Sequence, residues 1–492
     1  MSVTVVGFSP SQASKIRWHM PAEAAFATIF GAAVFAAVLW LPVVLFDPDT
    51  LWHITVGDAV LAHGTVPALD TYSFTMAGQP WMAHEWLSEV ILALAFRIGG
   101  WNGLMALTAA SAGATAGIVA FYVRRHMRID IALALVLLTV SSGELSLLAR
   151  PHMIALPALA LWTTMMVSAR ARHSAPSLWV LPLMTLWANL HGGFLAGLVL
   201  AAAMAAEALF DPACRPADTI RSWGLFIVGA VLAAMIGPHG IDVLFFPFRL
   251  MAMHDLAFIQ EWKPLNLGAI GGVSGSVLLA LYLGLTGRFQ LPRFRVLMVT
   301  ALIFVTMQHV RYAQVFAVMA PLLIADSLRS ARPAMRREWA IGGAVAALAV
   351  VSLCFRIGFP MAQPTEGNYA PAALASVPDD LRHKPVLNEY GFGGVLIFSG
   401  IRPFIDGRAD LYGDTFMDVY LAVARGNGAK LDAVLCEYRI AWTIFSPDSA
   451  VSSLMDRTPG WHRLFTDKNA VIHVRDVPAG TAACTAPPTI RS

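Results

Sequence analysis

The feature that most constrains this chain is a series of long apolar runs with charged residues gathered between them. Of its 492 residues, 57% are apolar and only 13% are charged, whereas soluble domains are about one quarter charged. Several runs reach the roughly 20 residues that a helix needs to cross a bilayer. The sequence therefore predicts a polytopic α-helical membrane protein with about 11 transmembrane helices, at 22–46, 101–123, 129–149, 152–169, 177–190, 193–210, 223–237, 270–286, 295–309, 312–327 and 338–357.

The basic residues predict the orientation of these spans, because Lys and Arg are enriched in cytoplasmic loops. Every basic cluster falls on one side of the predicted membrane, and no Lys or Arg occurs between Trp18 and Phe96. The net charge of +3 is small, which disfavours nucleic acid as a partner. We therefore predict a cytoplasmic N-terminus at 1–21, a transmembrane core at 22–357 with a long outer loop at 47–100, and an outer domain at 358–492.

The C-terminal region differs in composition from the rest, because charged residues become frequent after Pro371. Strand-like and helix-like segments alternate there, which is typical of a soluble α/β domain. The expected strands are "KPVLNEY", "RPFIDGRAD" and "AWTIFSP", followed by the hairpin "HRLFTDKNAVIHVRD". The expected helices are "GFGGVLIFSG", "KLDAVLCEYR" and "SAVSSLMDRT".

The long outer loop contains two expected helices. The segment "TLWHITVGDAVLAHG" places Leu51, Ile54, Val60 and Leu61 on one side and polar groups on the other. This pattern predicts an amphipathic helix on the membrane surface. The segment "HEWLSEVILALAFRIGG" predicts a second short helix that ends at a pair of glycines.

Uncommon polar residues are concentrated at the predicted outer ends of the spans, where we expect them to converge. The first outer loop contributes three acids and a histidine, and later outer turns contribute two histidines, two arginines, a glutamate and a lysine: Asp47, Asp49, His53, Glu85, Arg150, His152, His191, Glu261, Lys263 and Arg311. Arg has a planar fork that binds phosphate oxygens bidentately. A nearby carboxylate can act as a base or can hold a divalent metal. Together these groups predict a site for an anionic lipid phosphate.

Each of these residues also has a structural interpretation. Arg150 or Arg311 alone can extend its charge to the lipid headgroups, and His191 can cap the tight turn between two helices. Asp47 with Pro48 can simply end the first span, although carboxylates at membrane depth are costly and tend to be functional.

The acidic motif "FDPDTLWHI" resembles the motif on the first outer loop of the GT-C superfamily of membrane glycosyltransferases. The phrases "GQPWMAHEWLSEV", "ARPHM", "WANLHGGFLAGL", "QEWKP", "HVRY" and "RPFIDGRADLYG" are similar to those of a bacterial group within it, over about residues 45 to 475. The resemblance implies that Asp47 is a catalytic base or a ligand of Mg or Mn, with Asp49 as its partner. It further implies lipid-phosphate contacts from Arg150, His152 and Arg311. The residues Asp406 and Arg408 would contact sugar or would bridge the C-terminal domain to the core.

The function that this resemblance implies is transfer of a sugar from a polyprenyl-phosphate-linked donor, with membrane lipid around it, to a glycan, lipid or protein acceptor. The implied location is the bacterial cytoplasmic (inner) membrane, with the C-terminal domain in the periplasm. Two alternatives remain open: a transporter or flippase for lipid-linked sugars, and a non-catalytic protein of envelope polysaccharide assembly. Transporters usually place ionisable groups near the middle of the bilayer, and the predicted spans carry few charges there.

Overall fold

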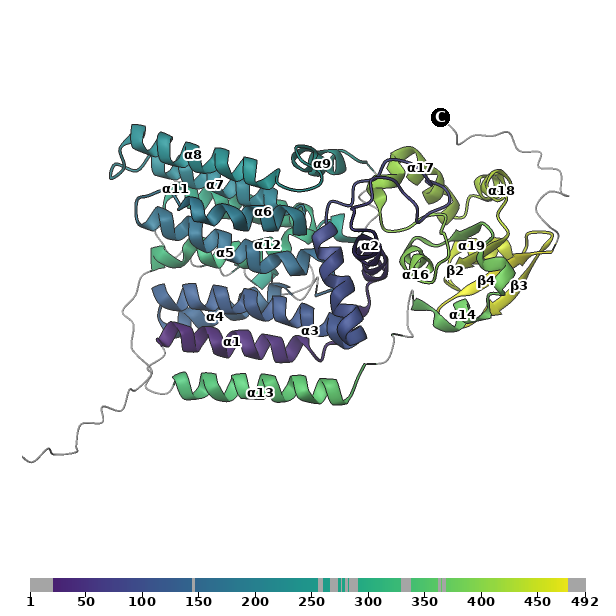
Figure 1. Ribbon diagram of the computed structural model, residues 1–492, viewed down its shortest axis with the longest axis horizontal. Coiled ribbons are helices and arrows are strands. Elements are labelled where there is room, and N and C mark those ends of the chain that lie inside the picture. The colour runs from purple at the N-terminus through teal and green to yellow at the C-terminus, as the bar shows by residue number, and fades with distance from the viewer. Residues whose placement is uncertain are drawn as a thin grey trace, which may run out of the picture.

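The chain folds into a helical bundle with an α/β domain at one end (Figure 1). The structure is a computed structural model that describes residues 21–143, 147–254, 260–265, 273–275, 277–278, 282, 291–328, 338–361, 364 and 369–476. The helices on the bundle side are α1 (Ala22–Val38), α2 (Asp49–His63), α3 (Trp86–His126), α4 (Ile129–Gly143), α5 (Pro151–Ala171), α6 (Leu181–Leu190), α7 (Phe194–Leu209), α8 (Pro216–Ala234), α9 (Asp242–Met251), α11 (Arg293–Gln308), α12 (Ala313–Ile324) and α13 (Glu338–Gly358). Short 3₁₀ helices are η1 (Pro42–Leu45), η3 (Leu178–Val180), η5 (Gln260–Trp262), η6 (Val310–Tyr312), η7 (Ala325–Leu328) and η9 (Tyr390–Phe392).

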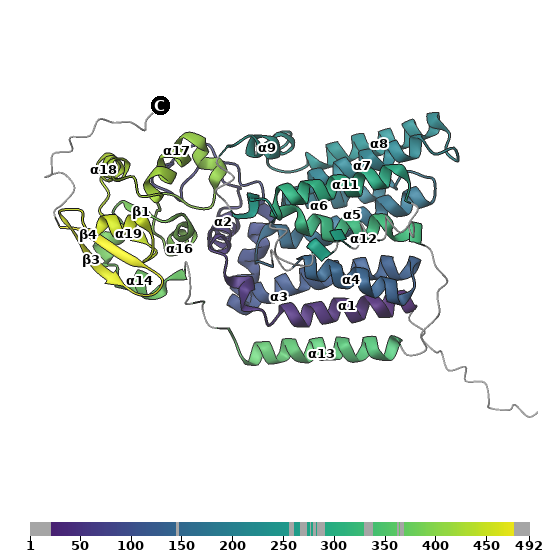
Figure 2. The ribbon, with the colours of Figure 1, turned by 180° about the vertical axis from the view of Figure 1, so that it is seen from behind.

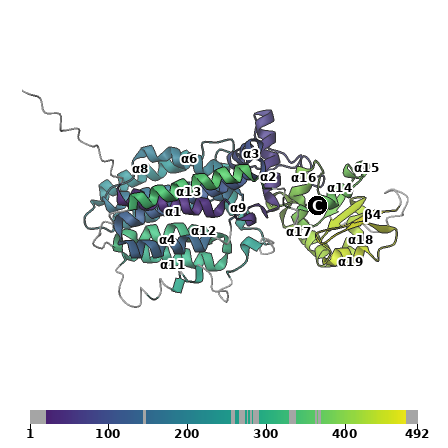
Figure 3. The ribbon, with the colours of Figure 1, turned by 90° about the horizontal axis from the view of Figure 1, so that it is seen from below.

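The helices of the bundle agree with the spans expected from the sequence. Each predicted span except 270–286 coincides with a helix, and 270–286 lies largely outside the described residues. Figures 1 and 3 show these helices side by side, and Figure 1 shows α13 at the edge of the bundle next to α1. By length and composition, four of the described helices can cross a membrane on their own: Trp86–His126, Pro151–Ala171, Pro216–Ala234 and Ala340–Gly358. The prediction of a polytopic helical membrane protein is confirmed.

Two boundaries near the first outer loop differ from the prediction. The first predicted span ran to residue 46, but α1 ends at Val38 and a separate 3₁₀ helix begins at Pro42. Proline lacks the backbone N–H that would continue the α-helix, so the chain breaks there. The second short helix and the following span form α3, which kinks at Gly100 with φ of 53°. Glycine tolerates this left-handed backbone without a steric penalty.

Helix α2 occurs where a helix was expected, and most residues of its first turns are buried. Figure 1 shows α2 end-on between the bundle and α16 (Gly393–Phe398) of the α/β domain. Leu51 and Ile54 are buried, and so are Trp52 and His53 on other sides of the helix. The helix is therefore confirmed, whereas its place on the membrane surface stays a prediction. On its polar side, His53 packs against Glu89 of α3, and Asp58 stays partly exposed.

The α/β domain is built on a four-stranded sheet in the order β1-β2-β4-β3 (Figure 2). Strands β1 and β2 are parallel, whereas β4 is antiparallel to both β2 and β3. The strands are β1 (Val386–Asn388), β2 (Trp442–Phe445), β3 (Trp461–Thr466) and β4 (Val471–Arg475), and the remaining helices are α14 (Pro371–Ser376), α15 (Asp379–Arg382), α17 (Ala409–Ala424), α18 (Gly428–Glu437) and α19 (Ala450–Met455). The prediction of a C-terminal α/β domain is confirmed.

One expected strand, "RPFIDGRAD", is absent. The segment is an irregular loop that leads into α17. The side-chain oxygen of Asn388 accepts the backbone N–H of Phe404 at 2.8 Å, which takes a donor that a strand would need for its ladder.

The domain is packed onto the bundle. Leu45 and Ala149 from the end of the bundle belong to the same hydrophobic cluster as Tyr369, Val395 and Trp442 of the domain. Full burial of an apolar side chain contributes about 1.5–3 kcal/mol. The shared cluster therefore gives the junction between the two parts a fixed geometry, and the polar residues described next lie at that junction.

Candidate functional site

A cavity of about 520 Å³ lies where the ends of the bundle helices meet the α/β domain. Its walls come from the starts of α2, α3, α5 and α12, the α6–α7 turn, η5, η6 and two segments of the domain. The polar and aromatic residues that line it are Asp49, Trp52, His53, Trp81, His84, Glu85, Glu89, Arg150, His152, Trp187, His191, Glu261, Trp262, Lys263, Arg311, Gln314, Tyr390, Arg408 and Asp410. The outer turns thus converge on one pocket, as the sequence led us to expect.

Arg150 is the centre of an ion cluster at the wall of this pocket. It is the N-cap residue of α5, and its guanidinium donates to both carboxylate oxygens of Asp47, with an Nη2–Oδ1 distance of 2.8 Å. Nη2 also donates to Asp49 at 2.5 Å, and Nη1 donates to Glu261. Three carboxylates therefore share one guanidinium. Arg150 was expected to bind lipid phosphate, but its donors are taken up by these acids.

Asp47 and Asp49 play different parts in this cluster. Asp47 is only 2% exposed and does not line the pocket. Its Oδ1 accepts the backbone N–H of Asp49 at 3.0 Å, which fixes the start of α2. Asp49 does line the pocket, and its side chain is 18% exposed. The geometry thus favours Asp49 over Asp47 as the carboxylate that meets a substrate.

The environment of Asp49 makes it suitable as a base near neutral pH. Burial raises the pKa of Asp49 to about 7, with a further upward contribution from Glu261 and a downward one from His53. A general base is most effective when its pKa lies near the working pH. The Asp49 carboxyl therefore has both the position and the pKa that proton abstraction requires.

A second polar group surrounds Glu85, the N-cap residue of α3. Its Oε1 lies 3.5 Å from Nε2 of His84 and 3.3 Å from Nε2 of His191. Burial alone would raise the pKa of Glu85, but the two histidines outweigh it and hold that pKa well below its usual range. Burial lowers the pKa of His191 to about 4, so this ring is neutral. Its Nδ1 accepts the N–H of Gly193 at 2.9 Å, which leaves Nε2 to donate toward Glu85.

Two further histidines lie on the same walls. Nδ1 of His53 is 3.3 Å from Oε1 of Glu89, and both side chains are buried. The ring of His152, in the first turn of α5, lies 6.3 Å from the ring of His191. The histidines expected to bind substrate therefore do share the pocket, and each is positioned by a neighbour on another helix or turn.

The cations left for an anionic ligand are Arg311 and Lys263. Among the described residues neither forms an ion pair with a carboxylate, and both line the pocket. The guanidinium of Arg311 lies over the ring of Trp262, 4.2 Å from its centre. This stacking orients the guanidinium plane and leaves its N–H groups available. Arg311 is thus the better-placed arginine for phosphate.

The pocket also has an apolar side that reaches into the bundle. Ala155, Leu156 and Leu159 of α5 and Val315 of α12 line it there. Aromatic rings of Trp52, Trp81, Trp187 and Trp262 line other parts of the wall. Apolar walls with a few polar groups are typical of ligand sites. This side can accept a hydrocarbon chain, and the aromatic faces suit the apolar faces of a sugar ring.

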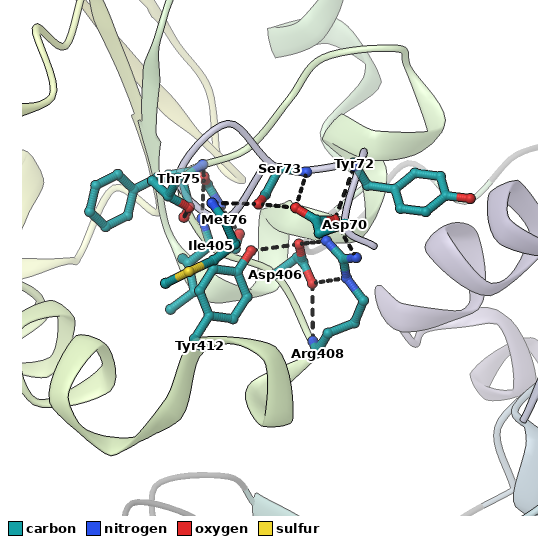
Figure 4. A network of polar contacts seen from close by, with 11 residues as sticks. Asp70, Tyr72, Ser73, Thr75, Met76, Ile405, Asp406, Arg408 and Tyr412 are labelled. Atoms are coloured by element: carbon teal, nitrogen blue, oxygen red, sulfur yellow. Dashed lines mark hydrogen bonds and ion pairs between the residues drawn. The ribbon is translucent and has the colours of Figure 1, made fainter. Parts of the chain in front are cut away.

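The residues Asp406 and Arg408 belong to a buried network that joins the domain to the long loop before α3 (Figure 4). Arg408 donates to Asp70 at 2.7 Å through Nη1, and to Asp406 at 2.8 Å through Nε and 2.7 Å through Nη2. The hydroxyl of Tyr412 donates to Asp406 at 2.7 Å. We call Asp70, Asp406, Arg408 and Tyr412 the latch. Of the two roles left open for Asp406 and Arg408, these contacts favour the bridge.

The acids near Arg150 do not fit a divalent metal as they stand. Both oxygens of Asp47 accept from the Arg150 guanidinium, which occupies the place of a cation. The prediction of Mg or Mn on Asp47 stays a prediction. Among the described residues, one group has atoms close enough to hold an ion, and it lies at the other end of the bundle: His173, Asp211 and Cys214.

Several pocket residues were not among those selected from the sequence. Glu89 is four residues after Glu85, a spacing that places both on one face of α3, so this signal was present in "HEWLSE". His84 precedes them directly. Tyr390 comes from the α/β domain, and no local pattern shows where that domain docks.

Comparison with known proteins finds similarity among solved structures. The sequence matches no protein-family model and no curated protein. Among solved structures, the chain is similar to a crystal structure of ArnT from Cupriavidus metallidurans bound to undecaprenyl phosphate, with 13% identity and a TM-score of 0.48 over 93% of this chain and 98% of that one. An identity this low and a TM-score below 0.5 leave the function to be argued from the pocket itself.

Proposed function

We propose that the chain is a membrane glycosyltransferase. It moves a sugar from a polyprenyl-phosphate-linked donor to a hydroxyl of a glycan, lipid or protein acceptor on the periplasmic face. The observation that carries the proposal is the pairing, in one pocket, of a carboxyl with a pKa of about 7 and two cations without carboxylate partners among the described residues: Asp49, Lys263 and Arg311.

The proposed reaction assigns a role to each of these groups. Asp49 accepts the proton of the acceptor hydroxyl, whose oxygen forms a bond to the anomeric carbon of the donor. The bond between that carbon and the phosphate oxygen breaks, and the electron pair leaves with the polyprenyl phosphate. Arg311 and Lys263 stabilise the negative charge that develops on the phosphate. The products are the glycosylated acceptor, polyprenyl phosphate and protonated Asp49, which returns its proton to solvent.

The shape of the pocket supports a lipid-linked donor. Leu156 and Leu159 line the side that enters the bundle, where a polyprenyl chain would lie next to the phosphate. The domain supplies Tyr390 and Asp410 on the other side, toward which the sugar and the acceptor would extend. A soluble sugar phosphate would leave the apolar side without a partner.

The location that we propose is the bacterial inner membrane, with the N-terminus in the cytoplasm and the α/β domain in the periplasm. The distribution of Lys and Arg supports this orientation. Cys436 of the domain is disulfide-bonded, whereas Cys214 and Cys354 on the bundle side are free. Disulfides persist in oxidising compartments such as the periplasm, which agrees with a domain outside the cytoplasm.

The position of the polar residues favours an enzyme over a transporter. Arg150 and Glu85 are N-cap residues, and His191 is the C-cap residue of α6. The pocket therefore gathers helix ends rather than groups at the middle of spans, where transporters hold their substrates. A non-catalytic assembly protein would not require a carboxyl with a raised pKa in the same pocket as cations.

The experiment that tests the proposal supplies purified protein in proteoliposomes with a panel of polyprenyl-phosphate-linked sugars and a mixture of glycan and lipid acceptors. We expect at least one donor to be converted to polyprenyl phosphate plus a glycosylated product, as measured by liquid chromatography and mass spectrometry. Protein-free vesicles and an Arg97→Gln variant serve as controls, because Arg97 pairs with Asp58 at the exposed surface.

Two outcomes would contradict the proposal. Movement of a labelled polyprenyl-phosphate sugar between leaflets, with no change in its mass, would indicate a flippase. Tight binding of undecaprenyl phosphate with no consumption of any donor across the panel would indicate a non-catalytic role.

A further inference from the structure

The latch is a buried ionic connection between two segments that are far apart in the sequence. Asp70 and Asp406 are fully buried, and Arg408 is 2% exposed. Figure 4 shows the guanidinium of Arg408 between the two carboxylates, one from each segment. Buried charges are costly unless they are paired and hydrogen-bonded. The contacts of Arg408 are therefore complete only when the domain is docked on the loop before α3.

Asp70 is itself rigidly held, so it provides a fixed anchor. Its Oδ1 accepts the backbone N–H of Tyr72 at 3.0 Å, and its Oδ2 accepts from the hydroxyl of Ser73 at 2.6 Å. Arg408 also lies over the ring of Trp81, 4.7 Å from its centre. Trp81 and Arg408 both line the pocket, so one latch residue, Arg408, is also part of the pocket wall.

The latch segment brings the α/β domain against the proposed base. Gly407 lies between the two latch residues Asp406 and Arg408 in the sequence, and a Cβ at Gly407 would overlap Oδ1 of Asp49. Close by, a Cβ at Gly394 would overlap the carbonyl oxygen of Pro48. Two glycines thus allow the domain backbone to contact the Asp-Pro-Asp motif directly. The covering of Asp49 depends on where the latch holds residues 406–410.

We propose that the latch is a positioning device, in which Asp70 and Arg408 hold the Asp406–Asp410 segment against Asp49 and so complete the pocket. The inference rests on the proposed function in taking Asp49 as the base. Asp70 and Asp406 do not line the pocket, so they act through Gly407 and the backbone. The soluble domain is on this account a part of the reacting site, and not only a module for recruiting partners.

If the latch has this role, loosening it should change kcat and the donor KM by different amounts. The cations proposed to bind the donor phosphate, Arg311 and Lys263, belong to the bundle side, and no hydrogen bond or ion pair among the described residues joins them to the latch. Loosening the latch therefore leaves the donor KM within about twofold and lowers kcat, because the lost interaction is made in the transition state. A displacement of about 1 Å in a reacting group can lower the rate about 100-fold.

The test uses Asp70→Asn in the full chain, which keeps the shape of the side chain and removes its charge. Hydrogen–deuterium exchange, measured without substrate, is expected to increase at residues 70–76 and 403–412. The value of kcat is expected to fall about 10- to 100-fold. Arg463→Gln is the matched control, because it breaks an exposed ion pair with Asp456 in the same domain and should change neither readout.

A second variant changes the contact between the domain backbone and Asp49 without removing an ion pair of the latch. Gly407→Ala keeps every ion pair of the latch but places a methyl group at the Asp49 carboxylate. We expect kcat to fall by a similar factor while exchange at residues 403–412 stays as in the wild type.

The outcomes decide between the roles. Unchanged exchange in Asp70→Asn, or faster exchange with unchanged kcat in both variants, would overturn the inference. Faster exchange in Asp70→Asn with a loss of kcat in both variants would support it. A wild type that consumes no polyprenyl-phosphate sugar would contradict the proposed function and the positioning role together, and the exchange data would still show whether the latch holds the domain.

Discussion

Two buried ion clusters lie at opposite ends of the bundle, and their composition differs. At the end away from the α/β domain, Arg170 and Arg295 pair with Glu207 at 3.3 and 3.2 Å, and Arg170 also pairs with Asp211 at 2.5 Å. Following the predicted orientation, we call this group the inner cluster and the group around Arg150 the outer cluster. Two arginines thus meet two carboxylates. At the domain end, the single guanidinium of Arg150 meets three carboxylates, and one of them, Asp49, borders a cavity.

The difference shows how a structural cluster can be told from a functional one. The inner cluster is balanced in charge, and none of its residues lines the pocket, so its contacts serve to join α5, α7 and α11. The outer cluster has more acid than its arginine can neutralise, which contributes to the raised pKa of Asp49. Perturbed pKa values in a cleft are typical of functional sites. The two clusters should therefore respond differently to mutation.

The largest expected effect is the loss of catalysis in Asp49→Asn. A general base contributes about 10²- to 10⁴-fold to a rate, so kcat for sugar transfer should fall by that factor. Folding should be retained, because a carboxyl with a raised pKa opposes folding once it is ionised, and at pH 8 the amide avoids that cost. Steady-state transfer and thermal unfolding, measured on the same preparation, check both parts.

The matched change in the inner cluster should affect stability and not catalysis. Glu207→Gln leaves Arg170 and Arg295 with one carboxylate between them, and breaking a buried pair costs about 3–5 kcal/mol. The melting temperature in detergent should fall, while kcat per folded molecule stays constant. Asp130→Asn is the control, because Asp130 forms an exposed pair with Arg128. A normal melting temperature for Glu207→Gln would show that the inner cluster is not structural.

Arg311 should contribute to affinity for the lipid phosphate. A hydrogen bond to a charged group contributes about 1.5–3 kcal/mol, so Arg311→Gln should weaken binding of undecaprenyl phosphate roughly 10- to 100-fold. Native mass spectrometry or a fluorescence titration measures this change, with Arg97→Gln as the control. Equal affinities for the two variants would remove Arg311 from the phosphate site.

The smallest expected effect is on the pH profile. Asp49 must be ionised to act as a base, and its pKa is about 7 because burial disfavours the charge, with Glu261 raising it further and His53 lowering it. The value of kcat/KM should therefore rise with pH and level off above about 7, and it should fall about tenfold for each pH unit below that value. A profile that is flat from pH 5 to 8 would exclude Asp49 as the titrating base.

The sequence was sufficient to predict the architecture because its signals are local and repeated. Apolar runs located the helices of the bundle, including the break at His191, and alternating patterns located the sheet. The one expected strand that is absent, "RPFIDGRAD", looks extended in isolation. The side chains of Asp406 and Arg408 form the ion pairs of the latch, and a backbone N–H of the segment donates to Asn388. No local pattern reveals these contacts.

The candidate site could be predicted only in part for the same reason. The polar outer turns were expected to converge, and Asp49, His53, His191 and Arg311 do share one pocket. Which of these residues faces the cavity depends on contacts with residues that are distant in the chain. Arg150 is separated from Asp47 by 103 residues, and their bidentate pairing hides Asp47 from the cavity and exposes Asp49 instead.

The most direct test of the central claim is the release of polyprenyl phosphate from a labelled polyprenyl-phosphate-linked sugar in sealed proteoliposomes. Donor and acceptor are supplied on the side of the α/β domain, and wild type is compared with Asp49→Asn in matched vesicles. We expect wild type to release polyprenyl phosphate in step with glycosylated product and Asp49→Asn to release almost none. Release by Asp49→Asn at the wild-type rate would contradict this claim.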